Sequence, residues 1–132
     1  MWPEAVERIA AFLRVAGVEG WLEELLPGAG PPAGQKLSAK GFDGNGVAMV
    51  AIVPAARSVD ERKLAAAAGA EVQPTPAAVF PFEEARVFMD QSILSLDSVW
   101  LEAGSPRHIL GLTPVQLVRV TNAETADLLR EG

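Results

Sequence analysis

The sequence predicts a mixed α/β fold (α+β), in which helices flank a compact mixed sheet. Short apolar runs bounded by glycine and proline alternate with segments in which apolar residues recur at helical spacing. This alternation of short strands with helices favours one sheet with helices packed on it. With 132 residues and 49% hydrophobic content, the chain 1–132 suits a single domain with its own core.

Three helices are expected, and each has a recognisable start. Pro3 suits a first helical turn, Asp60 suits an N-cap, and Thr113 precedes a proline at the third start. Gly17 and Gly69 end the first two helices, because glycine readily adopts the left-handed conformation found there. The expected helices cover residues 6–16, 61–68 and 115–120.

A hairpin is expected in the middle of the chain. Lys36–Phe42 and Val47–Val53 flank Asp43–Gly46, whose residues tolerate the positive backbone angles of tight turns. Val47–Val53 is almost wholly apolar, which predicts burial on both faces. Lys36–Lys40 is more polar, so we expect this strand to line a cleft.

The remaining segments are expected to be a connector, a loop and short strands. Pro27–Gly34 contains only proline, glycine and alanine, which predicts a connector, and three prolines make Gln73–Phe82 an irregular extended loop. Arg86–Met89 and Val99–Ala103 are expected to be strands.

Composition excludes several classes of function. The chain has no cysteine and one histidine, so we expect no metal site, no cofactor and no thiol chemistry. Asp90, Asp97 and Glu83 with Glu84 lack metal-ligand spacing and are expected to face water. A net charge of −6 argues against non-specific binding along a nucleic-acid backbone, so no DNA partner is expected, whereas a nucleic-acid end or a local basic pocket stays open. The sequence shows no signal peptide and no run of membrane-spanning length, which predicts a cytoplasmic protein.

The segment Leu101–Thr113, LEAGSPRHILGLT, is the strongest candidate for a functional turn. Gly104 permits a turn that a side chain would oppose, and Pro106 fixes the exit. The turn is expected to aim backbone amides and His108 at one point. His108 has a functional interpretation, as a proton acceptor or a ribose ligand, and a structural one. No acidic partner is fixed by spacing, so no catalytic triad with Ser105 is predicted.

Three segments resemble the YbaK/prolyl-tRNA synthetase-associated editing domains. They are VAIVPAARSVDERKLAAAAGA (50–70), VFPFEEARVFMDQSIL (79–94) and VWLEAGSPRHILGLTPVQLVRVT (99–121). The family pattern includes an Arg-x-x-Asp-x-x-x-Leu stretch, a Pro-Phe loop and a Gly-Ser/Thr-Pro turn. The matching positions are Arg57, Asp60, Leu64, Pro81, Phe82, Asp90, Ile93, Gly104, Ser105 and Pro106.

The resemblance implies a central mixed, largely antiparallel, curved sheet flanked by helices. It also implies a free-standing trans-editing deacylase, which hydrolyses the ester of a mischarged tRNA with a small amino acid, in the tRNA-Pro-like class. The implied partners are the 3′ end of an aminoacyl-tRNA and an aminoacyl-tRNA synthetase. Lys36 matches the family's functional lysine best, and Lys40 is the alternative. Such a cation would hold the terminal phosphate or polarise the ester carbonyl.

The resemblance also implies which residues bind the substrate: Ala77, Pro81, Phe82, Gly104, Ser105, Pro106 and His108. Ala77 stands where the family motif Gly-x-x-x-Pro has glycine. Phe80, Phe82 and Phe88 would line an apolar pocket for the amino-acid side chain or serve as core anchors. The alternative function is a catalytically inactive module that binds an aminoacyl or nucleotide ligand or a protein partner.

Overall fold

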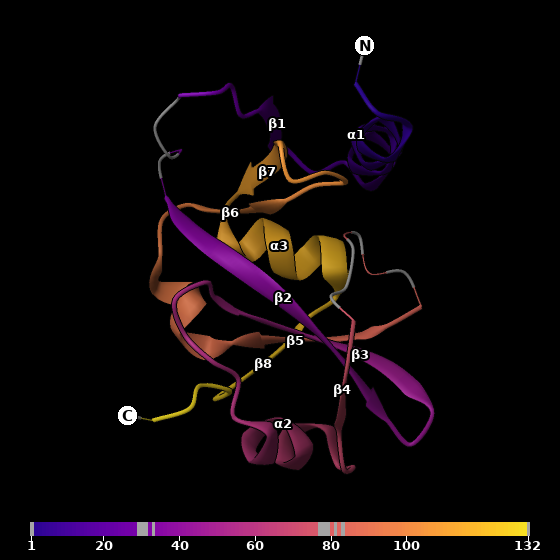
Figure 1. The fold of residues 1–132 in the computed structure, drawn as a ribbon, viewed down its shortest axis with the longest axis vertical. Coiled ribbons are helices and arrows are strands. Elements are labelled where there is room, and N and C mark those ends of the chain that lie inside the picture. The colour runs from indigo at the N-terminus through magenta and orange to yellow at the C-terminus, as the bar shows by residue number, and fades with distance from the viewer. Residues whose placement is uncertain are drawn as a thin grey trace.

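The computed structural model describes residues 2–28, 32, 34–76, 80, 82 and 84–131. Two predicted substrate-binding residues, Ala77 and Pro81, lie outside the described residues. The fold is a mixed sheet of eight strands with helices on both faces (Figure 1). The predicted mixed α/β class with a central mixed sheet is therefore confirmed.

The sheet runs in the order β1-β7-β6-β2-β3-β5-β8, and β4 adds to β2 beside this path. Neighbouring strands are antiparallel except for the pairs β2–β6, β3–β5 and β5–β8, which are parallel. The strands are β1 (Trp21–Glu24), β2 (Gln35–Gly44), β3 (Val47–Pro54), β4 (Gln73–Thr75), β5 (Arg86–Asp90), β6 (Val99–Glu102), β7 (His108–Leu112) and β8 (Glu124–Ala126).

The three α-helices begin within two residues of their expected starts. In α1 (Glu4–Ala16) the chain turns at Gly17, with φ 68°. In α2 (Glu61–Ala68) the Asp60 carboxylate accepts hydrogen bonds from the first-turn amides of Arg62 and Lys63. In α3 (Pro114–Thr121) the side chains of Thr113 and Gln116 form a reciprocal capping box. The caps of α2 and α3 satisfy amides that a helix start leaves without partners.

Two apolar clusters cover the two faces of the sheet. The first packs α1 and α3, through Ile9 and Leu117, against residues such as Leu37 and Ile52. The second packs α2, through Leu64, against the opposite face. Strand β3 contributes alternate residues to both clusters, which confirms the predicted burial of this strand on both faces, apart from its exposed first two residues.

Five elements were not predicted: strands β1, β4, β7 and β8, and the 3₁₀ helix η1 (Gln91–Ser95). The prediction of an irregular loop is wrong at Gln73–Thr75, which pairs with Gly41–Asp43 of β2. Pro74 is tolerated there because, among the described residues, β4 pairs along one edge. Gly41 permits the close approach, since a Cβ at this position would lie 2.3 Å from the Pro76 carbonyl oxygen.

The expectation that Asp90 faces water is also wrong. Its side chain is buried, with 1% of its surface exposed. One carboxylate oxygen accepts a hydrogen bond from the Leu128 amide at 2.8 Å, and the other accepts from the amide and hydroxyl of Ser92. Asp90 thus joins the end of β5 to η1 and to the C-terminal segment. No helix among the described residues is long and apolar enough to span a membrane.

Candidate functional site

Strand β2 has an edge that is only partly paired. Strand β3 pairs along one edge of β2, so β6 and β4 share the other edge, at Gln35–Lys36 and Gly41–Asp43 respectively. The Lys36 carbonyl accepts from the Ala55 amide at 3.0 Å and so faces β3. Because peptide groups alternate between the two edges of a strand, those of Leu37 and Ala39 face the gap between β6 and β4.

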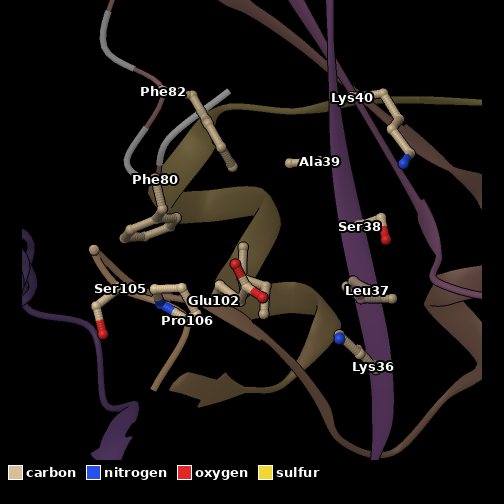
Figure 2. A pocket seen from close by; sticks show the side chains of 12 residues that line it. Lys36, Leu37, Ser38, Ala39, Lys40, Phe80, Phe82, Glu102, Ser105 and Pro106 are labelled. Atoms are coloured by element: carbon tan, nitrogen blue, oxygen red, sulfur yellow. The ribbon is translucent and has the colours of Figure 1, made fainter. Parts of the chain in front are cut away.

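A pocket of ≈ 370 Å³ opens at this gap, where β6 diverges from β2 (Figure 2). Five consecutive residues of β2 form one wall, and the end of β6 with the following turn forms the facing wall. The lining residues are Lys36, Leu37, Ser38, Ala39, Lys40, Phe80, Phe82, Leu101, Glu102, Gly104, Ser105 and Pro106. The prediction that the strand Lys36–Lys40 lines a cleft is confirmed.

The turn after β6 lies close against helix α1. Gly104 has φ 84°, a conformation that residues with side chains rarely adopt, and a Cβ there would lie 3.0 Å from the Val6 amide nitrogen. The Ala103 amide donates to the His108 carbonyl at 2.9 Å and closes the turn. The predicted need for glycine therefore has two physical causes, the backbone angle and the nearby helix.

Ser105 and His108 are in direct contact. Ser105 Oγ lies 2.8 Å from His108 Nδ1 and accepts a hydrogen bond from the Arg107 amide at 3.1 Å. In Figure 2 the Ser105 hydroxyl points away from Phe80 and Glu102. The Ser105–His108 contact therefore stabilises the turn behind the pocket wall.

His108 itself does not line the pocket. It is 4% exposed and packs edge-on against Trp2, with the ring centroids 5.3 Å apart. Its Nε2 atom has no hydrogen-bond partner among the described residues. Of its two predicted roles, this position matches the structural one.

An aromatic wall closes another side of the pocket. Phe80 and Phe82 are both buried and stack edge-to-face with centroids 5.5 Å apart, and Phe12 of α1 stacks on Phe80 at 6.2 Å. Phe82 has φ 62°, which is costly for a residue with a bulky side chain and is found where packing fixes the backbone. Phe88 packs in the cluster under α2 and is a core anchor.

The charged residues of the pocket are exposed and lack ion-pair partners within the described part of the chain. The Lys36 Nζ atom lies 5.4 Å from the centroid of the ring of Trp100, a residue of the neighbouring strand β6. Figure 2 shows Lys36 extending toward Glu102, whereas Lys40 extends from the other side of β2. The geometry therefore favours Lys36 over Lys40 as the cation that faces the pocket interior.

The structure brings most of the predicted site residues together. The same pocket is lined by Lys36, Phe82, Gly104, Ser105 and Pro106, although they come from three distant parts of the sequence. Glu102 was not among the predicted site residues, and its signal in the sequence is an acid that ends an apolar strand beside the Gly104 turn. No group of three or more potential metal ligands occurs among the residues that the structure describes.

Comparison with known proteins finds solved structures with a similar fold. No family model matches the chain, and no curated protein matches its sequence. A structure described as a "putative trans-editing enzyme for prolyl tRNA synthetase" has a TM-score of 0.84 at 20% identity, covering 99% of this chain and 100% of that one. A scaffold protein from work on epitope backbone grafting by computational design gives the same values. A hypothetical protein has a TM-score of 0.79 at 16% identity, covering 93% and 99%.

The chain has the fold that the resemblance implies. A TM-score of 0.84 over the whole length confirms the YbaK-like sheet flanked by helices. At 20% identity this likeness establishes the fold alone. The activity must therefore be argued from the pocket.

Proposed function

We propose that this protein is a free-standing editing deacylase that acts on tRNA in the cytoplasm. It hydrolyses the ester between a small amino acid and a tRNA of the tRNA-Pro-like class. The observation that carries the proposal is the convergence of Lys36, Phe82 and the Gly104 turn on one pocket. This convergence occurs in a fold shared with a structure described as a "putative trans-editing enzyme for prolyl tRNA synthetase".

The pocket has a suitable size and lining for the aminoacyl end of a tRNA. Its volume of ≈ 370 Å³ falls in the range of about 300–1,000 Å³ typical of small-molecule sites. Phe80 and Phe82 offer an apolar surface to a small side chain. A second, hydrolytic site is useful for such side chains, because one methylene changes binding by only about 1–3 kcal/mol.

Lys36 supplies positive charge where the reaction develops negative charge. Water adds to the ester carbonyl carbon, and the carbonyl oxygen becomes an oxyanion beside the Lys36 ammonium. The bond from that carbon to the ribose oxygen then breaks. The ribose oxygen takes up the proton that the attacking water released, and the new carboxylic acid loses its proton to solvent and leaves as a carboxylate. The peptide groups of Leu37 and Ala39, which face the gap, offer hydrogen bonds that orient the substrate.

The proposed partner is the 3′ end of an aminoacyl-tRNA, presented alone or by a synthetase. The chain has a net charge of −6, so the affinity for tRNA must come from local cations. Lys40, the other lysine that lines the pocket, suits a terminal phosphate and leaves Lys36 for the ester carbonyl.

Hydrolysis across a panel of mischarged tRNAs tests the proposal. We expect turnover of at least one small aminoacyl ester, and a loss of about 100-fold or more in kcat for Lys36→Ala. Lys40→Ala should have a smaller effect, and Arg119→Ala, which removes an exposed cation of α3 outside the pocket, should have none. Absence of turnover on the whole panel would instead favour a module that binds the aminoacyl end without cleaving it.

A further inference from the structure

The pocket combines three kinds of surface in one small volume. Lys36 and Lys40 lie on the β2 wall, Glu102 lies on the β6 wall, and the aromatic rings of Phe80 and Phe82 form the apolar part. Figure 2 shows the Glu102 side chain in the space between Phe80 and β2. A ligand that satisfies all three surfaces carries a cationic group, an electron-rich carbonyl or anionic group, and an apolar group.

The strand register explains why Glu102 faces the same space as Lys36. Lys36 pairs with Trp100 across β2 and β6, and Glu102 is two residues further along β6. Because side chains alternate between the faces of a strand, Trp100 and Glu102 share a face. The two strands diverge beyond this pair, which separates the ammonium and the carboxylate enough to leave them unpaired within the described residues.

We propose that the Glu102 carboxylate binds the α-ammonium group of the aminoacyl ester and makes the pocket specific for esters whose α-amino group is free. This inference rests on the proposed function and extends it to the substrate class. Glu102 accepts charge-assisted hydrogen bonds from the ammonium, the side chain of the amino acid lies against Phe80 and Phe82, and the ester carbonyl is directed toward Lys36. An N-acylated amino group has no charge to bind and adds bulk at the Glu102 wall.

A matched pair of substrates tests this inference. The rates kcat/KM are measured for one aminoacyl-tRNA and for the same tRNA with the amino acid N-acetylated. We expect wild-type protein to favour the free-amino ester by about tenfold or more. The variant Glu102→Gln should lose about tenfold or more on the free-amino ester and change by less than about twofold on the N-acetylated one.

Glu23→Gln is the matched control. Glu23 on β1 and Glu102 on β6 both pair with Ile109 of β7, from opposite sides, but Glu23 lies outside the pocket lining. Glu23→Gln should keep the wild-type preference for the free-amino ester over the N-acetylated one. An equal loss on both substrates in Glu102→Gln, or no loss on either, would overturn the inference. Because Glu102 is exposed, the unfolding midpoint of its variant should match that of the wild type.

A binding measurement separates this inference from the proposed function. An amide-linked aminoacyl-adenosine, which resists hydrolysis, is titrated into the wild type and Glu102→Gln, with and without N-acetylation. If no ester is hydrolysed but the wild type prefers the free-amino analogue and Glu102→Gln does not, ammonium recognition stands while the deacylase proposal fails. If esters are hydrolysed and neither protein shows a preference, the deacylase proposal stands and the role of Glu102 is disproved.

Discussion

Lys63 and Arg86 form ion pairs near helix α2, whereas the charged residues at the pocket form none among the described residues. On the α2 side, Lys63 Nζ bonds the Asp127 carboxylate at 3.0 Å and the Leu129 carbonyl at 2.8 Å. At the pocket, Lys36 and Glu102 have no ion-pair partner in the part of the chain that the structure describes. The charged residues near α2 therefore connect elements of the fold, whereas those at the pocket are available to a ligand.

The pKa shifts follow this division. The hydrogen bond to Asp127 raises the pKa of Lys63, and the hydrogen bonds to Glu124 raise the pKa of Arg86. The same hydrogen bonds from Arg86 lower the pKa of Glu124. Arg86 also donates to the Ala68 carbonyl at 2.9 Å, so it joins the end of α2 to both β5 and β8. Four substitutions test the comparison, and their expected effects on stability decrease in order.

The largest effect is expected for Asp90→Ala. The substitution leaves the buried Leu128 amide and the Ser92 amide without their carboxylate acceptor. We expect the free energy of unfolding to fall by about 3 kcal/mol or more, measured by urea denaturation. Asp97→Ala, which removes an exposed carboxylate a few residues away, is the control and should change stability by less than about 0.5 kcal/mol. Similar small losses for both variants would contradict the role of Asp90.

The next effect is expected for Gly104→Ala, which tests the pocket turn. The new side chain meets both an unfavourable φ of 84° and the backbone of α1 at 3.0 Å. We expect a loss of about 2–3 kcal/mol in the free energy of unfolding. Gly17→Ala has a similar φ of 68° and no atom within 4 Å of the new Cβ, so it should lose only about 1 kcal/mol. If the two losses are equal, the close approach of α1 has no energetic importance.

A smaller, pH-dependent effect is expected for Glu124→Gln. The pKa of Glu124 is lowered from its ordinary value of 4.5, so its ion pair with Arg86 contributes stability above about pH 4.5. That contribution is lost as the pH falls through the lowered pKa of the folded state. Both side chains are substantially exposed, at 39% and 51%, which limits the loss in the variant to about 1 kcal/mol at neutral pH.

Urea denaturation at neutral pH and near pH 3 measures this effect. The difference between wild type and Glu124→Gln should shrink at the lower pH. Glu131→Gln, at an exposed C-terminal residue 3.8 Å from Lys63, should show a weaker pH dependence. If the difference in unfolding free energy between wild type and Glu124→Gln were larger near pH 3 than at neutral pH, the lowered pKa of Glu124 would be contradicted.

The smallest effect on stability is expected for Lys36→Met. The contact of its ammonium with the Trp100 ring is solvent-exposed, and such contacts contribute about 0.5–1 kcal/mol. Methionine keeps the apolar part of the contact, so we expect less than about 0.5 kcal/mol of change in the unfolding free energy. The same variant should lose the hydrolytic activity. A large loss of stability would show that Lys36 stabilises the fold as Lys63 and Arg86 do, and the difference between the pocket and the α2 side would disappear.

Capping residues and turn glycines correctly predicted the helices and the hairpin, because their ends are determined by residues close in the sequence. Asp60 and Thr113 cap their helices as expected, and the turn at Gly44–Gly46 joins the predicted hairpin. The short strands β4 and β8 were missed because three residues carry too little pattern, and their pairing depends on distant strands. For the same reason the burial of Asp90, whose partner Leu128 is far along the chain, could not be read locally.

The candidate site was predicted in part, and the resemblance contributed most of it. The polar strand Lys36–Lys40 and the Gly104 turn were predicted to matter, and both line the pocket. The pattern of residues could not reveal that β6 pairs with only two residues of β2 and then diverges. That divergence brings Glu102 into the pocket. His108, the most conspicuous residue of the sequence, packs behind the turn against Trp2.

The contact between Lys36 and Trp100 also gives the protein an internal optical probe. The emission of an indole changes when a nearby charge moves, and the Trp100 ring lies 5.4 Å from an ammonium that a ligand would attract. Trp2 lies beside His108, and the ring of Trp21, on the edge strand β1, lies over Gly111, the residue of β7 that pairs with Trp100. A protein with Trp2→Phe and Trp21→Phe would therefore report occupancy of the pocket through a single fluorophore, without a label and without turnover.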